Sequence, residues 1–364
     1  MERILSITNL NGLFIIDSYK KTVNNLNMET KTNIFFHAPK ELTTDAFLVW
    51  LIYYLDSDEE NKEYKQAFFD SLILKTEDCG RSIGSIELKR QENNVDVLLA
   101  FRFEDNGEEQ TVLFEDKTWS MPHSEQLARY KEIYPNCYRF FYYKLGYINS
   151  QEEREVSQKK YEVINAGMMS STLEKMIGLH PLIKMYYDYI TYTFVDAINS
   201  FHERIFMKHD YDVLWSADAQ KYFCDTIVEN MTEQNVPYLR IANGTSYGRP
   251  WTEITIVEKK DGYWECLFWR VDIRSGKFYI RLNQYAEPSE KEVDYKMHRL
   301  EVLRNEANQI IGTMPDLHLG KVENRATKES EVLIFFLEDN NLEMLLESIP
   351  KISRHMIDVF QRLE

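Results

Sequence analysis

Two strand-like runs joined by a short turn constrain the fold of this 364-residue chain more than any other feature. The runs VDVLLAFRF (95–103) and QTVLFEDK (110–117) have the β-branched and aromatic content of strands. Between them lies EDNG (104–107), whose Asn-Gly pair is a strong hairpin signal. A third run of this kind, GSIELKR (84–90), comes before them. The sequence therefore predicts a three-stranded antiparallel meander.

Helical patterns flank this meander on both sides. Two apolar segments, 42–55 and 63–75, precede it, and SEQLARYKEIY (124–134) follows it with apolar residues at helical spacing. The run CYRFFYYKL (137–145) then has strand composition again. This order predicts an α/β domain over residues 1–150, in which a mixed sheet is flanked by helices.

The second half of the chain, residues 151–364, predicts an α+β extension. We expect the polar stretch 149–160 to be a surface connection and the glycine-bearing segment 243–248 to be a loop. The expected helices are 181–204, 216–232, 291–311 and 340–362, and the expected strands are 252–259, 263–273 and 277–286. The extension is either a separate module or an elaboration packed on the first half.

Composition limits the partners that this chain can have. Its net charge of -16 opposes phosphate binding, unless a cleft is locally basic or divalent cations are bound there. No apolar run is long enough to span a membrane, and the first residues do not resemble a secretory signal. The four cysteines are scattered without a CxxC pair, which favours reduced thiols in a cytoplasm.

The hairpin predicts a cluster of charged side chains at one end of the sheet. Asp96 lies near the start of its first strand, and Glu115 and Lys117 lie at the end of its second. An antiparallel pairing brings these two ends together. Alternation along the strand places Glu115 and Lys117 on one face and turns Asp116 away. Two adjacent carboxylates repel unless a cation lies between them, so the cluster favours a hard divalent ion such as Mg²⁺ or Mn²⁺.

Asp96 followed by Glu115-x-Lys117 across such a hairpin resembles the PD-(D/E)XK nuclease superfamily. The residue before Asp96 is Val95 where many members have proline, and the aspartate is the metal ligand in that superfamily. The resemblance covers residues 35–145.

Two further elements extend this resemblance. Gln126 and Tyr130 have the spacing of the QxxxY element found in RecB-like members, and Glu41 precedes the first apolar helix, where members often place an additional metal-site glutamate. The most similar subgroup is a poorly characterised bacterial and phage set.

The resemblance implies a restriction-endonuclease-like fold and a Mg²⁺- or Mn²⁺-dependent nuclease. Its substrate would be DNA rather than RNA, in phage defence or phage biology, and a homodimer is left open. The catalytic residues would be Asp96, Glu115, Lys117 and Gln126, the metal ligands Glu41, Asp96, Glu115 and Asp116 (the last through its backbone carbonyl), and the substrate contacts Arg129 and Tyr130.

All of these residues except Asp116 also have a purely structural explanation. Asp96 would be a strand-end cap, and Glu115 with Lys117 would be a surface ion pair. The others would be a helix-terminal carboxylate (Glu41), solvated side chains (Gln126, Arg129) and a core aromatic (Tyr130). In that case the chain would be a catalytically silent nuclease-fold protein that acts as a binding or interaction module.

Overall fold

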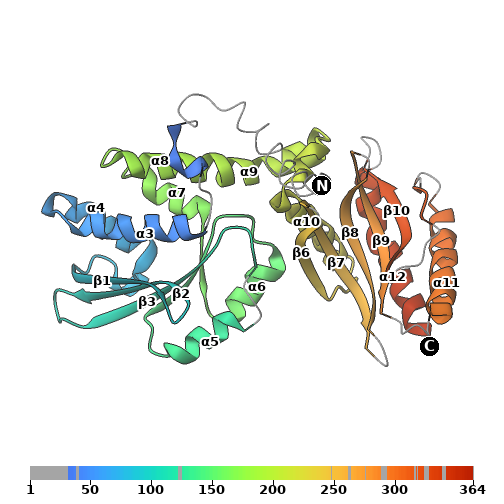
Figure 1. Ribbon diagram of the computed structural model, residues 1–364, viewed down its shortest axis with the longest axis horizontal. Coiled ribbons are helices and arrows are strands. Elements are labelled where there is room, and N and C mark those ends of the chain that lie inside the picture. Colours follow the sequence, from blue (N-terminus) through green and yellow to red (C-terminus); the bar gives the residue numbers. More distant parts are fainter. Residues whose placement is uncertain are drawn as a thin grey trace, which may run out of the picture. The chain divides into compact units, whose positions relative to one another are not determined.

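The computed structural model describes residues 32–37, 41–121, 125–246, 248–260, 264–274, 276–287, 293–314, 317, 319–323, 328–337 and 342–363. These residues form two compact units. The first ends at Asn199, and the second begins at Ser200 (Figure 1).

A mixed five-stranded sheet organises the first unit. Its strands are β1 (Ile83–Glu92), β2 (Val95–Phe103), β3 (Glu109–Lys117), β4 (Arg139–Lys144) and β5 (Glu162–Asn165). They lie in the order β1-β2-β3-β4-β5. The first three strands pair antiparallel, whereas β3, β4 and β5 pair parallel. The predicted meander and the predicted α/β class are therefore confirmed.

Helices cover both faces of this sheet, with α3, α7 and α8 on one face and α5 and α6 on the other (Figure 1). The helices of the unit are α3 (Glu41–Asp56), α4 (Lys62–Phe68), α5 (Gln126–Ile133), α6 (Ser150–Gln158), α7 (Ala166–Glu174), α8 (Pro181–Ile190) and α9 (Asp196–His202), which crosses into the second unit.

Strand β3 lies at the centre of the sheet and is buried from Val112 to Lys117. Val112 and Phe114 belong to the apolar cluster on the α3 face, whereas Leu113 belongs to the cluster on the α5 face. The alternation therefore continues into the charged residues at the end of the strand, so that Glu115 and Lys117 follow Leu113 while Asp116 follows Phe114.

The predicted surface connection at 149–160 is wrong, because its central part is the helix α6. Asn149 caps this helix, and its side chain accepts a hydrogen bond from the N–H of Glu152 at 2.8 Å. Val156 is buried against the α5 side of the sheet. The strand β5 that follows was not predicted, and it carries the sheet of the first unit beyond residue 150.

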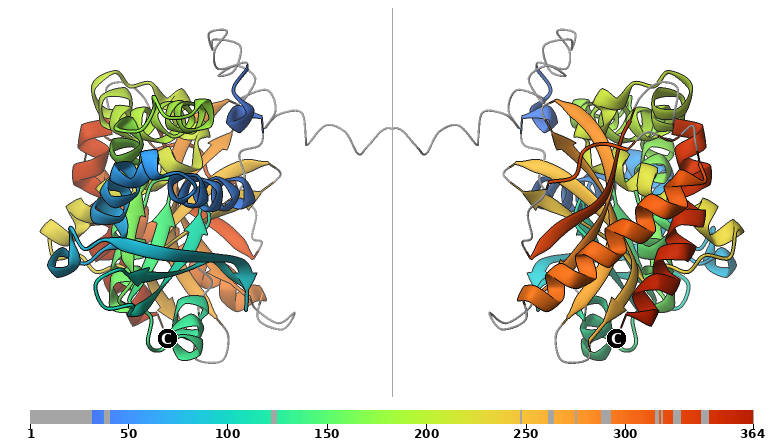
Figure 2. Two further views of the ribbon diagram at one scale, coloured as in Figure 1. Left: turned by 90° about the vertical axis from the view of Figure 1, so that its left-hand side faces the viewer. Right: turned by 90° about the vertical axis from the view of Figure 1, so that its right-hand side faces the viewer.

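An antiparallel five-stranded sheet organises the second unit (Figure 2). Its strands lie in the order β10-β9-β8-β7-β6 (Figure 1). Its strands are β6 (Arg240–Ser246), β7 (Arg249–Lys259), β8 (Glu265–Arg274), β9 (Lys277–Ala286) and β10 (Glu329–Phe336). Its longest helices are α10 (Ala217–Glu233), α11 (Val293–Gly312) and α12 (Leu342–Arg362).

The three strands predicted for this half are confirmed as β7, β8 and β9, whereas β6 and β10 were not predicted. The expected loop at 243–248 is wrong from Asn243 to Ser246, because these residues belong to β6. Gly244 permits the pairing, since a Cβ atom there would lie 2.5 Å from the ring of Trp251 on β7.

Polar bonds inside the second unit tie its helices to its sheet. The indole N–H of Trp269 donates to Ser353 on α12 at 2.8 Å. On α11, the guanidinium of Arg299 forms a buried ion pair with Glu265 of β8, also at 2.8 Å. In the part of the chain that the structure describes, no helix is long and apolar enough to cross a membrane.

Candidate active site

The β2–β3 hairpin brings Asp96 to the end of β3. The pairing runs from Arg102 opposite Glu109 to Val97 opposite Phe114, so Asp96 and Glu115 are the next residues along the two strands. The backbone N–H of Asp116 donates to Asp96 Oδ2 at 2.8 Å. The carboxylate of Asp96 therefore accepts the next hydrogen bond between the two strands, at the point where their backbone pairing ends.

Glu115 and Lys117 form an ion pair beneath α5 and α6. Glu115 is fully buried and Lys117 is 7% exposed, so the alternative of a surface ion pair is wrong. Lys117 Nζ bonds to Glu115 Oε1 and, at 3.1 Å, to the backbone carbonyl of Asp116. Among the described residues, Glu115 Oε2 has no hydrogen-bond partner. A buried carboxylate oxygen without a partner is costly, which makes this atom a candidate ligand.

The electrostatics of this pair are set by burial and by Asp96. Burial, followed by the charge of Asp96, raises the pKa of Glu115 to about 8. Burial alone would lower the pKa of Lys117, but the charges of Glu115 and Asp96 outweigh it and raise that pKa. Without a bound cation, Glu115 therefore ionises beside Asp96 only at about pH 8 and above.

Glu41 connects the start of α3 to the segment that follows β3. Its Oε1 atom accepts hydrogen bonds from the N–H of Thr118 and from the hydroxyl of Ser120, each at 3.1 Å. Glu41 also lies in the first turn of α3, so its alternative explanation as a helix-terminal carboxylate fits the structure as well. The structure therefore places Glu41 next to the end of the strand that carries Glu115 and Lys117.

On the opposite face of β3, Asp116 faces a carboxylate that the sequence analysis missed. Asp45, on α3, is 2% exposed, and Asp116 is 1% exposed. Burial and the charge of Asp96 raise the pKa of Asp45 to about 7, and burial and Asp45 raise the pKa of Asp116 well above its usual range. The available signal was helical spacing, since Asp45 lies one turn after Glu41.

Gln126 and Tyr130 lie on α5 and bond to each other. The side-chain amide of Gln126 donates to the Tyr130 hydroxyl at 2.9 Å, and that hydroxyl donates to the backbone carbonyl of Asn94. Gln126 Oε1 is buried and has no partner within the described part of the chain. Tyr130 is fully buried, which matches its core explanation rather than the predicted substrate contact. Arg129 is exposed, with its guanidinium 5.2 Å from the Tyr130 ring centroid.

The backbone carbonyl of Asn94, which accepts the hydrogen bond from Tyr130, belongs to the turn just before Asp96. Asn93 and Asn94 have φ of 53° and 65°, a left-handed conformation that suits a two-residue hairpin loop. The side chain of Asn93 donates to the Tyr134 hydroxyl at 2.8 Å. Helix α5 therefore fixes the turn from which Asp96 extends.

The donor set suits a hard cation. Within the described ranges, no three Asp, Glu, His or Cys side chains are arranged to enclose a metal ion. Asp96 and Glu115 nevertheless lie together, and one carboxylate oxygen of Glu115 has no partner. Mg²⁺ commonly binds through one or two carboxylates and completes its coordination with water and substrate phosphate. Two adjacent carboxylates with a backbone carbonyl beside them fit that pattern.

Comparisons with known proteins give one distant likeness. No known protein family matches this chain, and no curated protein matches it. Among solved structures, a match is found to the MspJI restriction endonuclease in complex with a 27-mer oligonucleotide, with a TM-score of 0.27 and 14% identity. The match covers 53% of this chain and 40% of that one.

Proposed function

We propose that the first unit is a divalent-metal-dependent nuclease that hydrolyses phosphodiester bonds, with DNA as a better substrate than RNA. One observation carries the proposal: Asp96, Glu115 and Lys117 converge at one end of a hairpin, and Glu115 is buried with an oxygen that lacks a partner among the described residues. The order of residues in the resemblance supports the proposal independently of this geometry.

The roles follow from the chemistry of each group. Asp96, Glu115 and Glu41, with the carbonyl of Asp116, would hold a Mg²⁺ or Mn²⁺ ion. When bound, the ion would supply positive charge to the phosphate. Lys117 would orient the attacking water and stabilise negative charge on the phosphate in the transition state. Gln126 Oε1 would accept a hydrogen bond from that water.

The test is a nicking assay with the full chain on supercoiled DNA, single-stranded DNA and RNA, with Mg²⁺ or Mn²⁺. We expect nicking of DNA, and we expect Glu115→Gln and Lys117→Met each to reduce its rate by roughly 100-fold or more. Glu109→Gln is the matched control, because Glu109 lies on the same strand in an exposed pair with Arg102.

A wild-type chain that is inert on all three substrates with both metals would contradict this function. It would favour a binding module on a nuclease-like fold, and calorimetry with Mn²⁺ would support that reading if it gave no binding.

A further inference from the structure

A second buried ion pair lies beside the candidate site. Lys144, the last residue of β4, contacts Glu152 of α6 at 2.9 Å, and both side chains are fully buried. The Tyr142 hydroxyl donates to the same Glu152 oxygen at 2.6 Å. Removing two charges from water costs more than their attraction usually returns, so stability is a weak explanation for this pair.

The ammonium group of Lys144 points at the segment that follows the candidate catalytic strand. Its Nζ donates to the backbone carbonyl of Ser120 at 2.5 Å. Lys144 pairs with Lys117 in the parallel register, and the N–H of Gly146 donates to the carbonyl of Thr118 at 2.9 Å. The end of β4 thus holds the chain at two points just beyond Lys117.

That same segment holds Glu41. Thr118 contributes its N–H and Ser120 its hydroxyl, and both bonds go to one oxygen of the Glu41 carboxylate. The contacts therefore form an unbroken series from Glu152 through Lys144 and Ser120 to Glu41. Residues that orient a metal ligand in this way affect metal affinity without touching the ion.

We propose that Lys144, held by Glu152, is a positioning residue that fixes the Thr118–Ser120 segment and thereby the carboxylate of Glu41. The effect of Lys144 on metal binding rests on the function proposed above. The contacts by which Lys144 fixes the Thr118–Ser120 segment do not depend on that function. Lys144 was not singled out by its sequence, because a lysine at a strand end is usually solvated.

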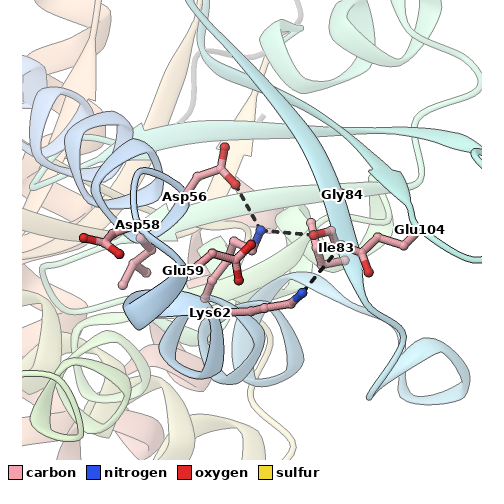
Figure 3. Close-up of a pocket in the computed structure, with 9 residues that line it drawn as sticks. Asp56, Asp58, Glu59, Lys62, Ile83, Gly84 and Glu104 are labelled. Atoms are coloured by element: carbon pink, nitrogen blue, oxygen red, sulfur yellow. Dashed lines mark hydrogen bonds and ion pairs between the residues drawn. The ribbon is translucent and has the colours of Figure 1, made fainter.

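The other end of the same sheet offers a matched control (Figure 3). There Lys65 Nζ bonds at 3.0 Å to Asp56 and at 3.0 Å to the backbone carbonyl of Ile83, in a polar pocket that Glu104 also lines. Lys65 therefore makes the same two kinds of bond as Lys144, to a carboxylate and to a backbone carbonyl. It lies by the start of β1, away from Glu41.

The first measurement is amide hydrogen exchange at Thr118 in the full chain, without metal. We expect Lys144→Met to speed this exchange by about tenfold, because it releases the Ser120 carbonyl. We expect Lys65→Met to leave it unchanged. Exchange at Thr118 that is equally slow in wild type and Lys144→Met would overturn the proposal.

If Lys144→Met does not fold, Tyr142→Phe serves in its place, since it removes only the hydroxyl that holds Glu152. The same faster exchange at Thr118 is expected, to a smaller degree, and its absence would overturn the proposal.

The second measurement is Mn²⁺ affinity by calorimetry. We expect Lys144→Met to weaken binding by about 10- to 100-fold and Lys65→Met to leave it as in wild type. In a Glu41→Ala background, Lys144→Met should cause no further loss, because its effect passes through Glu41. An equal additional loss in that background would overturn the proposal. If wild type binds no Mn²⁺, the proposed function fails, and the exchange measurement alone decides the role of Lys144.

Discussion

Asp96 accepts a hydrogen bond from the backbone N–H of Asp116, at 2.8 Å, across the two strands of one hairpin. Through this bond a candidate metal ligand also fixes the backbone next to Glu115 and Lys117. Charge and hydrogen bonding at this position can therefore be separated by mutation.

Asp96→Asn should keep the hydrogen bond and remove the charge. We expect this variant to match or exceed wild-type stability while it loses Mn²⁺ binding and nicking. Asp96→Ala should instead lower the free energy of unfolding by about 1–3 kcal/mol, because the Asp116 N–H loses its partner. Urea unfolding measures the difference. Equal stability of the two variants would show that the bond contributes nothing.

The raised pKa of Glu115 predicts a pH-dependent stability. Between its ordinary value of 4.5 and about 8, the folded chain keeps a proton on Glu115 that the unfolded chain releases. The free energy of unfolding therefore falls as pH rises through this window. With EDTA at pH 8, we expect Glu115→Gln to be more stable than wild type, by on the order of 4 kcal/mol.

This difference should vanish well below pH 4.5, where the carboxyl group is protonated in both states. Urea unfolding at the two pH values checks it, with Glu109→Gln, at an exposed glutamate of the same strand, as the control. Mn²⁺ should stabilise wild type and not Glu115→Gln, because only wild type offers the carboxylate. A wild-type chain more stable than Glu115→Gln at pH 8 in EDTA would contradict the prediction.

The buried pair of Glu265 and Arg299 should dominate the stability of the second unit. Arg299→Met leaves Glu265 charged and buried, so we expect a loss of about 3–5 kcal/mol in the free energy of unfolding. The double variant Glu265→Leu with Arg299→Met should lose less free energy of unfolding than Arg299→Met alone. If the two side chains contributed independently, the double variant would lose more.

The control for that pair is Arg102→Ala, which breaks the exposed pair with Glu109 and should cost under about 1 kcal/mol. Urea unfolding followed by circular dichroism compares the variants.

Gly244 should be intolerant of any side chain. Gly244→Ala would place its Cβ against the Trp251 ring, so we expect a loss of about 1–3 kcal/mol and altered tryptophan fluorescence. In the same unit, Gly312→Ala is the control, because nothing lies within 4 Å of a Cβ at that position. Similar fluorescence and stability in both variants would show that the Trp251 ring can move aside at no cost.

Local rules predicted the hairpin and the faces of its residues well. The Asn-Gly turn set the pairing of β2 with β3, and alternation placed Glu115 and Lys117 on the opposite face from Asp116. These features depend only on neighbours along the chain and on one strand pairing. They could therefore be predicted without knowledge of the packing.

Features that depend on distant packing were missed. Asp45 and Lys144 are ordinary residues within an apolar helix and an aromatic strand, and only the fold buries them beside the site. Helix α6 has a polar composition, and its buried Val156 and the Asn149 cap are features of the folded chain. The composition of residues 243–248 is typical of a loop. The packing of the Trp251 ring on Gly244 across the β6–β7 pairing is visible only in the fold.

The proposed function requires that Asp96 and Glu115 hold a divalent cation. Crystals grown with Mn²⁺, measured at the manganese absorption edge, test it directly. We expect an anomalous peak between the carboxylates of Asp96 and Glu115, within about 2.0–2.3 Å of an oxygen from each. That peak should be absent in crystals of Glu115→Gln. Mn²⁺ crystals with no peak at this position, and with Lys117 still bonded to Glu115, would contradict the claim.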